Sequence, residues 1–224
     1  MKPICIFYHI LLRLGDPPEL VPLAFDILCE QLEMMEESGL VAAASDFQVG
    51  INDSMEIADY ADFLLPPNAK MVFHGLESRS ECLTILMLEN WSKTHPGWNV
   101  LYLHAKGSSK TNSAEIQHSA FWRRGMMEDM VLNWQACVVR LVRHDIVCSH
   151  WKWNVADGSQ SIAAGNFWWA TSDFLAKLPS IMSRGQVKQD GIGALSSRYE
   201  AEVWLGNGPK PSVFQFRSHG AGMP

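Results

Sequence analysis

Apolar and polar positions alternate in blocks along the chain, as expected when strands and helices follow one another. Residues 4–12 form a short apolar run rich in β-branched and aromatic side chains, which predicts a buried strand. Over residues 19–37 the apolar positions recur at helical spacing, and Ser38-Gly39 supplies a signal that ends a helix. The next apolar run, residues 40–44, predicts a second strand.

The same alternation continues to the end of the chain. This order predicts an α/β fold with one mainly parallel central sheet and helices on both faces. Ligands of such sheets bind beyond the carboxyl ends of the strands, so the residues after each strand are the first candidates for a site. We expect helices over 55–64, 80–93, 114–143 and 172–178, strands over 70–73, 99–104, 145–148 and 167–171, and two further elements over 198–205 and 212–216.

The composition is that of a globular domain. The chain has 224 residues, of which 47% are hydrophobic and 19% charged. This suits a single domain over residues 1–224, either alone or as one domain of a longer protein. The formal net charge of −6 argues against a general nucleic-acid-binding role, because nucleic-acid-binding surfaces are basic.

The five cysteines are spread along the chain, and none forms a zinc-binding spacing. Most lie in apolar runs, which favours buried free thiols and a reducing compartment. No apolar stretch approaches the roughly 20 residues that span a membrane, and the N-terminus lacks a signal-peptide pattern. We therefore expect a cytoplasmic protein without a transmembrane segment.

Charge and tryptophan are distributed unevenly. Residues 14–69 contain twelve acidic side chains and no Lys or Arg, whereas residues 70–224 contain sixteen basic and twelve acidic side chains. All nine Trp residues follow Glu89. An anionic ligand is therefore expected against the later two-thirds of the chain.

The strand at 99–104 is followed by His104-Ala105-Lys106-Gly107-Ser108-Ser109-Lys110. A glycine lets the backbone approach an anion closely, and a lysine supplies a point charge suited to phosphate. The order of residues is not that of a Walker P-loop. This segment is either an anion-binding turn or a solvated surface turn, and its place at the end of a central strand favours the first.

Two aromatic segments follow. In Phe121-Trp122-Arg123-Arg124 an arginine could contact a diphosphate through its planar fork, or both arginines could be surface charges. In Gly165-Asn166-Phe167-Trp168-Trp169 the rings could stack on a sugar, with the amide holding a hydroxyl, although an aromatic run more often belongs to the core.

Two carboxylates, Glu200 and Glu202, lie two residues apart near the C-terminus. On a strand they would share a face, and on a helix they would diverge. A carboxylate beside a bound sugar can act as a general base, whereas a plain surface pair would have no chemical role.

Four segments taken together resemble a group of GT-A-type glycosyltransferases and glycosyltransferase-like domains from bacterial polysaccharide clusters, algae and large algal viruses. The group's pattern reads YxHxKG, then WRxxM, GNFWWA and RYxxExW. Each segment alone is weak, but four in the same order are more specific. They span about residues 100–205 and are Tyr102-Leu103-His104-Ala105-Lys106-Gly107, Trp122-Arg123-Arg124-Gly125-Met126, Gly165-Asn166-Phe167-Trp168-Trp169-Ala170 and Arg198-Tyr199-Glu200-Ala201-Glu202-Val203-Trp204.

The resemblance implies a GT-A-like domain that transfers a hexose or pentose from a nucleotide-diphosphate sugar to a hydroxyl of a glycan or glycoprotein. A UDP-sugar is favoured, and a GDP-sugar remains open. By this analogy Glu202, or else Glu200, is the general base, and inversion of configuration is favoured. The implied nucleotide-sugar-binding residues are Tyr8, His9, His104, Lys106, Gly107 and Arg123, and the implied sugar- or acceptor-binding residues are Gly165, Asn166, Trp168 and Trp169.

One feature departs from many GT-A enzymes, which hold Mn²⁺ or Mg²⁺ with an Asp-x-Asp motif. No Asp-x-Asp occurs in this chain, and His104-Ala105-Lys106 stands at the corresponding place. Lys106, together with Arg123, would then neutralise the leaving diphosphate, and a metal cofactor stays open. The alternatives are a non-catalytic carbohydrate-binding or inactive transferase-like module, or another α/β enzyme that acts on a phosphorylated small molecule.

Overall fold

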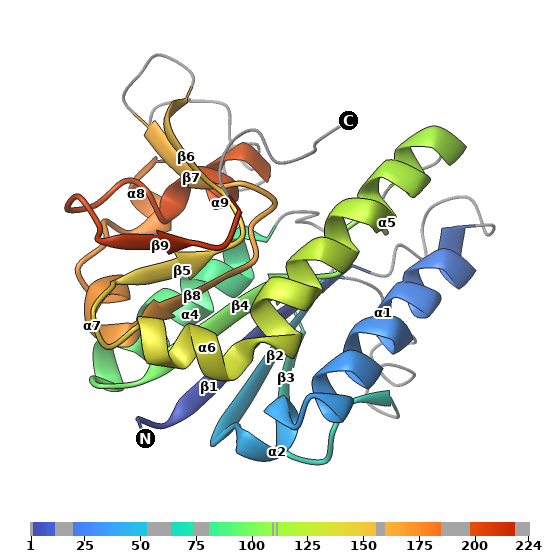
Figure 1. The fold of residues 1–224 in the computed structure, drawn as a ribbon, viewed down its shortest axis with the longest axis horizontal. Coiled ribbons are helices and arrows are strands. Elements are labelled where there is room, and N and C mark those ends of the chain that lie inside the picture. Colours follow the sequence, from blue (N-terminus) through green and yellow to red (C-terminus); the bar gives the residue numbers. More distant parts are fainter. Residues whose placement is uncertain are drawn as a thin grey trace.

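A computed structural model provides the fold of the chain (Figure 1). It describes residues 2–11, 20–52, 64–73, 81–108, 110, 112–155, 160–184 and 198–217. The helix expected over 55–64 lies outside the described residues except for Leu64.

The centre of the molecule is a seven-stranded sheet with the order β3-β2-β1-β4-β8-β5-β9. All neighbouring pairs run parallel except those made by β8, which is antiparallel to both β4 and β5. The expected α/β architecture with a mainly parallel central sheet is thereby confirmed. The strands are β1 (Ile4–Leu11), β2 (Asp46–Asn52), β3 (Ala69–Phe73), β4 (Asn99–His104), β5 (Ile146–Cys148), β8 (Trp168–Thr171) and β9 (Val213–Gln215).

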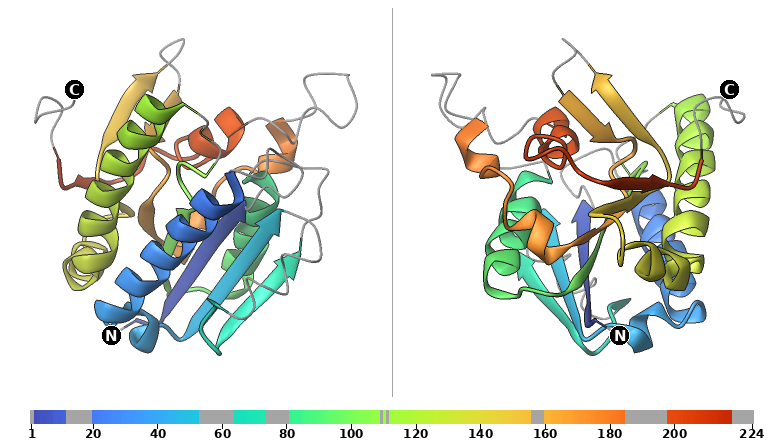
Figure 2. Two further views of the ribbon diagram at one scale, coloured as in Figure 1. Left: turned by 90° about the vertical axis from the view of Figure 1, so that its right-hand side faces the viewer. Right: turned by 60° about the vertical axis from the view of Figure 1, so that its left-hand side comes forward.

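Helices cover both faces of this sheet (Figures 1 and 2). The alternation of β1 shows why: Ile6 and Tyr8 pack into one hydrophobic cluster with α1 and the α5–α6 region, whereas Cys5 and Phe7 pack into another with α4, α7 and α9. Every β1 residue from 4 to 10 is therefore buried, as in a strand covered on both sides. The helices are α1 (Leu20–Glu37), α2 (Leu40–Ala43), α4 (Cys82–Thr94), α5 (Ser113–Met127), the π-helical turn η1 (Glu128–Leu132), α6 (Trp134–Arg140), α7 (Ser172–Leu175), α8 (Ile181–Arg184) and α9 (Arg198–Trp204).

Two local features differ from the sequence prediction. Residues 40–44, expected to be a strand, form the short helix α2, and the strand begins only at Asp46. A run this short carries no period, and the left-handed Gly39 (φ 74°) turns the chain directly into a new helical turn. A hairpin of β6 (Trp151–Val155) and β7 (Gln160–Ala163) was not expected from the sequence.

Among the described helices, none is long and apolar enough to cross a membrane.

Candidate functional site

A cavity of about 300 Å³ lies beyond the carboxyl end of β4. One wall comes from the turn after β4 and from α5. The other comes from the β6–β7 hairpin, the loop before β8, and α9. The lining residues are Lys106, Gly107, Lys110, His118, Ser119, Trp122, Lys152, Ile162, Ala164, Gly165 and Glu202.

The lining of the cavity is cationic. Lys106, Lys110 and Lys152 contribute three ammonium groups, and Glu202 is the one carboxylate among the described residues that line the cavity. Lys110 is 3.1 Å from Glu115 on α5, so part of its charge is balanced locally. The remaining excess of positive charge, next to the indole of Trp122, suits an anionic ligand that also has an apolar or ring-shaped part.

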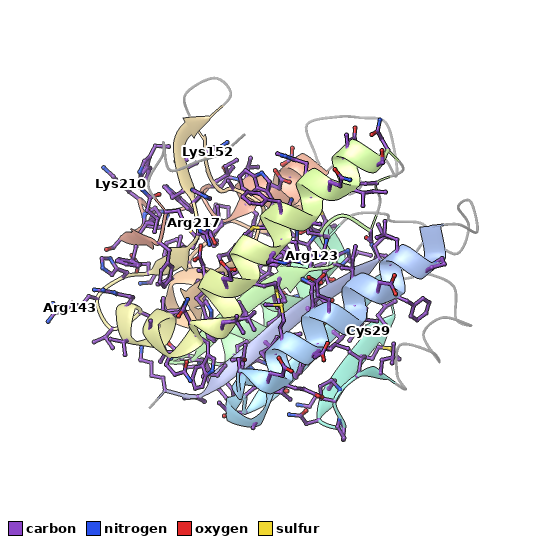
Figure 3. The ribbon with its side chains drawn as sticks, turned by 45° about the vertical axis from the view of Figure 1, so that its right-hand side comes forward. Cys29, Arg123, Arg143, Lys152, Lys210 and Arg217 are labelled. Atoms are coloured by element: carbon purple, nitrogen blue, oxygen red, sulfur yellow. The ribbon has the colours of Figure 1, made fainter. Side chains whose placement is uncertain are left out.

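The turn that carries Lys106 is held from behind by Arg123. Its guanidinium donates to the carbonyl of Lys106 (2.9 Å) and pairs with Glu30 on α1 (2.6 Å), and Arg123 is only 6% exposed. Figure 3 shows Arg123 between α5 and α1. Arg123 therefore supports the turn and is not among the residues that line the cavity. That it neutralises a diphosphate stays a prediction. Gly107 has φ 99°, a left-handed conformation that glycine adopts without strain.

The opposite segment, before β8, contains two residues with positive φ: Gly165 (86°) and Asn166 (56°). The Nε2 of His104 lies 3.1 Å from the carbonyl oxygen of Gly165, which joins this segment to the end of β4. Because a carbonyl only accepts, Nε2 of His104 carries the proton in this contact. His104 is buried and is not among the lining residues, so it supports the cavity rather than lining it.

Asn166 is buried below the cavity and joins two partners. Its side-chain nitrogen donates to Oε2 of Glu81 (2.6 Å), and its oxygen accepts from the indole of Trp168 (2.9 Å). The hydroxyl of Tyr102 donates to the same oxygen of Glu81 (2.8 Å). Burial, reinforced by the Glu81 carboxylate, raises the pKa of Tyr102 well above its usual value, so its hydroxyl stays a donor.

The two tryptophans of the GNFWWA segment lie in the core. Trp168 and Trp169 have no exposed surface; the first stacks on Tyr102, and the second donates to the carbonyl of Met130 (2.8 Å). The structure does not bring either ring to the cavity surface. The indole that lines the cavity is that of Trp122, for which the sequence analysis proposed no contact with a ligand.

Tyr8 and His9 on β1 are also buried and do not line the cavity. Tyr8 donates to Gln31 (2.7 Å), and Gln31 in turn donates to the carbonyl of His104 (3.2 Å). Burial raises the pKa of Tyr8. Nδ1 of His9 lies 2.8 Å from the hydroxyl of Thr84. Both residues therefore lie in the protein interior, beside the last two residues of β4.

The paired carboxylates belong to α9, so they diverge around a helix. Glu202 lines the cavity, whereas Glu200 is not among the lining residues. The turn after α9 approaches β7 very closely: a Cβ added at Gly206 would overlap the carbonyl oxygen of Ser161. This packing explains how Glu202 and Ile162 come to line the same cavity.

The donor set of this site does not match a divalent metal. Among the residues that the structure describes, no group of three or more His, Cys, Asp or Glu side chains could hold a metal ion. Lysines occupy the cavity, and ammonium groups bind anions rather than Mn²⁺ or Mg²⁺.

The structure thus brings together Lys106, Gly107, Gly165 and Glu202 of the expected residues. Sequence reasoning gave no site role to Lys152, His118 or Glu81. Lys152 alternates with Trp151 and Trp153, a pattern that could have revealed a strand with one polar face. For Glu81 no local signal exists, because its partners lie 21 and 85 residues away in the sequence.

Solved structures show distant likenesses to this chain. One is a protein from Desulfovibrio desulfuricans named a nucleotide-diphospho-sugar transferase, with 10% identity, a TM-score of 0.46, and coverage of 96% of this chain and 80% of the other. Another is HddC from Yersinia pseudotuberculosis, with 11% identity, a TM-score of 0.44 and coverage of 80% of both chains. A third is the 4-diphosphocytidyl-2C-methyl-D-erythritol synthase of Anaerococcus prevotii, with 10% identity, a TM-score of 0.43, and coverage of 89% and 82%. At these TM-scores none assigns an activity.

No curated protein matches the chain in sequence. A family model does match, over residues 7–190, and that range includes the β4 turn, α5, the hairpin and the Gly165 segment. Its description is "Domain of unknown function (DUF8361)". The match covers well over half of the 224 residues, and the chain therefore belongs to the DUF8361 family.

Proposed function

We propose that this protein is a glycosyltransferase that moves a sugar from a nucleotide-diphosphate sugar to a hydroxyl of a glycan or glycoprotein. A UDP-sugar is the favoured donor, with a GDP-sugar open. The observation that carries the proposal is the cavity itself. Among its described lining residues it combines three lysines with a single carboxylate, beyond the carboxyl end of a central strand.

In this proposal the two kinds of charge have different tasks. The ammonium groups of Lys106 and Lys110 neutralise the charge that develops on the leaving diphosphate, the part a metal ion plays in other enzymes. Glu202 accepts the proton of the acceptor hydroxyl. The acceptor oxygen bonds to the anomeric carbon while the bond from that carbon to the phosphate oxygen breaks, and a nucleoside diphosphate leaves.

The same lining supports inversion of configuration. A retaining mechanism with a covalent intermediate needs a second carboxylate as nucleophile, and the described lining offers Glu202 alone. A single displacement by the acceptor inverts the anomeric carbon. The ring of Trp122 would contact the sugar or the base of the nucleotide.

Nucleotide binding tests this function most directly. UDP, GDP, CDP and ADP, each with and without Mn²⁺, are added during thermal unfolding. At a concentration about a hundredfold above its Kd, a ligand of the folded state stabilises it by about 2.7 kcal/mol, which should raise the Tm by about 5–10 °C. An unchanged Tm with every nucleotide and with the corresponding nucleotide sugars would refute the proposal. Glycan binding that ignores nucleotides would instead indicate a non-catalytic carbohydrate-binding module.

Replacement of Lys106 by methionine should weaken UDP binding about tenfold or more. Methionine keeps most of the side-chain length but removes a charge-assisted contact to phosphate, which is worth about 1.5–3 kcal/mol. Titration calorimetry measures the Kd. Lys210→Met is the matched control, because Lys210 lies over Trp153 outside the cavity, and its Kd should stay within about twofold of the wild type. Equal affinities for the Lys106→Met and wild-type proteins would remove Lys106 from the site.

A further inference from the structure

A buried carboxylate below the cavity joins the two segments that form its walls. Glu81, immediately before α4, is 5% exposed and does not line the cavity. Its Oε2 accepts from Asn166 (2.6 Å) and Tyr102 (2.8 Å), and its Oε1 lies 3.6 Å from Nδ1 of His104.

These contacts close a ring. His104 is the last residue of β4 and stands two positions before Lys106. Asn166 directly follows Gly165, which lines the cavity. The ring closes where Nε2 of His104 meets the carbonyl of Gly165 at 3.1 Å. Glu81 therefore contacts both cavity segments, and these segments also contact each other.

The conformation of Asn166 makes this contact consequential. Its φ of 56° is left-handed, a conformation that costs most residues with a Cβ roughly 1–2 kcal/mol and that asparagine tolerates better because its side chain can hydrogen-bond nearby. Both ends of its amide are engaged, by Glu81 and by Trp168. Without the carboxylate, the side-chain nitrogen of Asn166 would be buried without this acceptor, and the segment would lose the bond that fixes its turn.

A buried carboxylate at this position is not explained by the stability of the fold alone. A buried ionic group often contributes less to stability than a well-packed apolar residue of the same size. What this side chain offers here is one oxygen, Oε2, that accepts from both Asn166 and Tyr102 in a fixed geometry, while its other oxygen faces His104. The geometry points to a role in shaping the cavity.

We propose that Glu81 is a positioning residue that fixes the Lys106 turn and the Gly165 segment relative to each other, and thereby sets the affinity of the cavity for a diphosphate. The ligand named here rests on the function proposed above. The positioning of the two segments by Glu81 does not depend on that function, so a separate measurement tests it.

The experiment compares Glu81→Ala, Glu81→Asp and Glu81→Gln with Glu89→Ala as a matched control. Glu89 is another buried carboxylate of the same region, on α4, but it binds Ser180 and the backbone of Ile181, outside the cavity. Amide hydrogen exchange over residues 102–108 and 163–167 reports the geometry, and the Kd for UDP reports the cavity.

Glu81→Ala should speed exchange in both segments together and weaken UDP binding about tenfold. Glu81→Asp keeps the charge but shortens the side chain by one methylene, so it should also speed exchange and weaken UDP binding, to a smaller extent. This variant serves as the test if the alanine variant does not fold. Glu81→Gln should restore both readouts, since its oxygen can accept from Asn166 while its amino group faces Nδ1 of His104. Glu89→Ala should lower the Tm without changing either readout.

The proposal is overturned if exchange in the two segments stays as in the wild type, or if Glu89→Ala changes it equally. A glutamine variant as impaired as the alanine variant would also overturn it, because charge rather than geometry would then matter. If the wild-type protein binds no nucleotide, the proposed function fails, while the exchange measurement still decides the role of Glu81.

Discussion

Replacement of Glu202 by glutamine is expected to reduce sugar transfer by about 10²–10⁴-fold while leaving the Kd for UDP within about twofold of the wild type. Glutamine has nearly the same shape but cannot take the proton of the acceptor hydroxyl. Among the described residues that line the cavity Glu202 is the single carboxylate, and His118 is the other side chain that could take a proton. The loss should therefore appear in kcat rather than in donor binding.

The matched control is Glu200→Gln. Glu200 belongs to the same helix, two residues away, but does not line the cavity, so its variant should keep transfer within about threefold. Donor hydrolysis and transfer to a panel of glycan acceptors are measured side by side with calorimetry. Full transfer by Glu202→Gln would show that another group is the base, and loss of UDP binding would show that Glu202 supports the donor site instead.

The pattern of apolar positions predicted the fold well where an element is long or fully buried. The strand β1 is apolar except for His9, β4 is apolar between its terminal Asn99 and His104, and α1 repeats its apolar face over 18 residues. The pattern failed where an element is short. Residues 40–44 span about one helical turn and could not be told from a strand, and the hairpin strands β6 and β7 have only five and four residues.

The candidate site was predictable in position but not in the task of each residue. The cavity lies at the turn after β4, where the rule that ligands of parallel sheets bind at the carboxyl ends of strands placed the candidate site. Within the motifs, however, the sequence does not distinguish a residue that lines a cavity from one that supports it. Arg123 and Asn166 both had chemistry suited to a ligand, yet both are buried and hold backbone segments in place. Exposure depends on tertiary packing, which the motif letters do not encode.

The second large effect is expected at Gly206, in the turn that follows α9. A Cβ at this position would overlap the carbonyl oxygen of Ser161 and stand 2.7 Å from its carbonyl carbon. Both are backbone atoms of β7, so no side-chain rotation can relieve the overlap. Gly206→Ala should therefore destabilise the protein by about 3 kcal/mol, the upper part of the range for overpacking, and lower the Tm by about 6–12 °C.

Gly208→Ala separates this effect from a general intolerance of alanine in the turn. Its Cβ would meet the end of the Leu178 side chain, which can rotate away, so the expected loss is below about 1 kcal/mol. Glu202 and Ile162 line the cavity from α9 and β7, so a substitution that forces these two elements apart should also change the cavity. The folded Gly206→Ala protein should therefore transfer sugar more slowly than the wild type. Thermal unfolding and donor hydrolysis measure the two consequences. If Gly206→Ala unfolded at the same temperature as Gly208→Ala, the close packing of α9 on β7 would not be what places Glu202 beside the lysines.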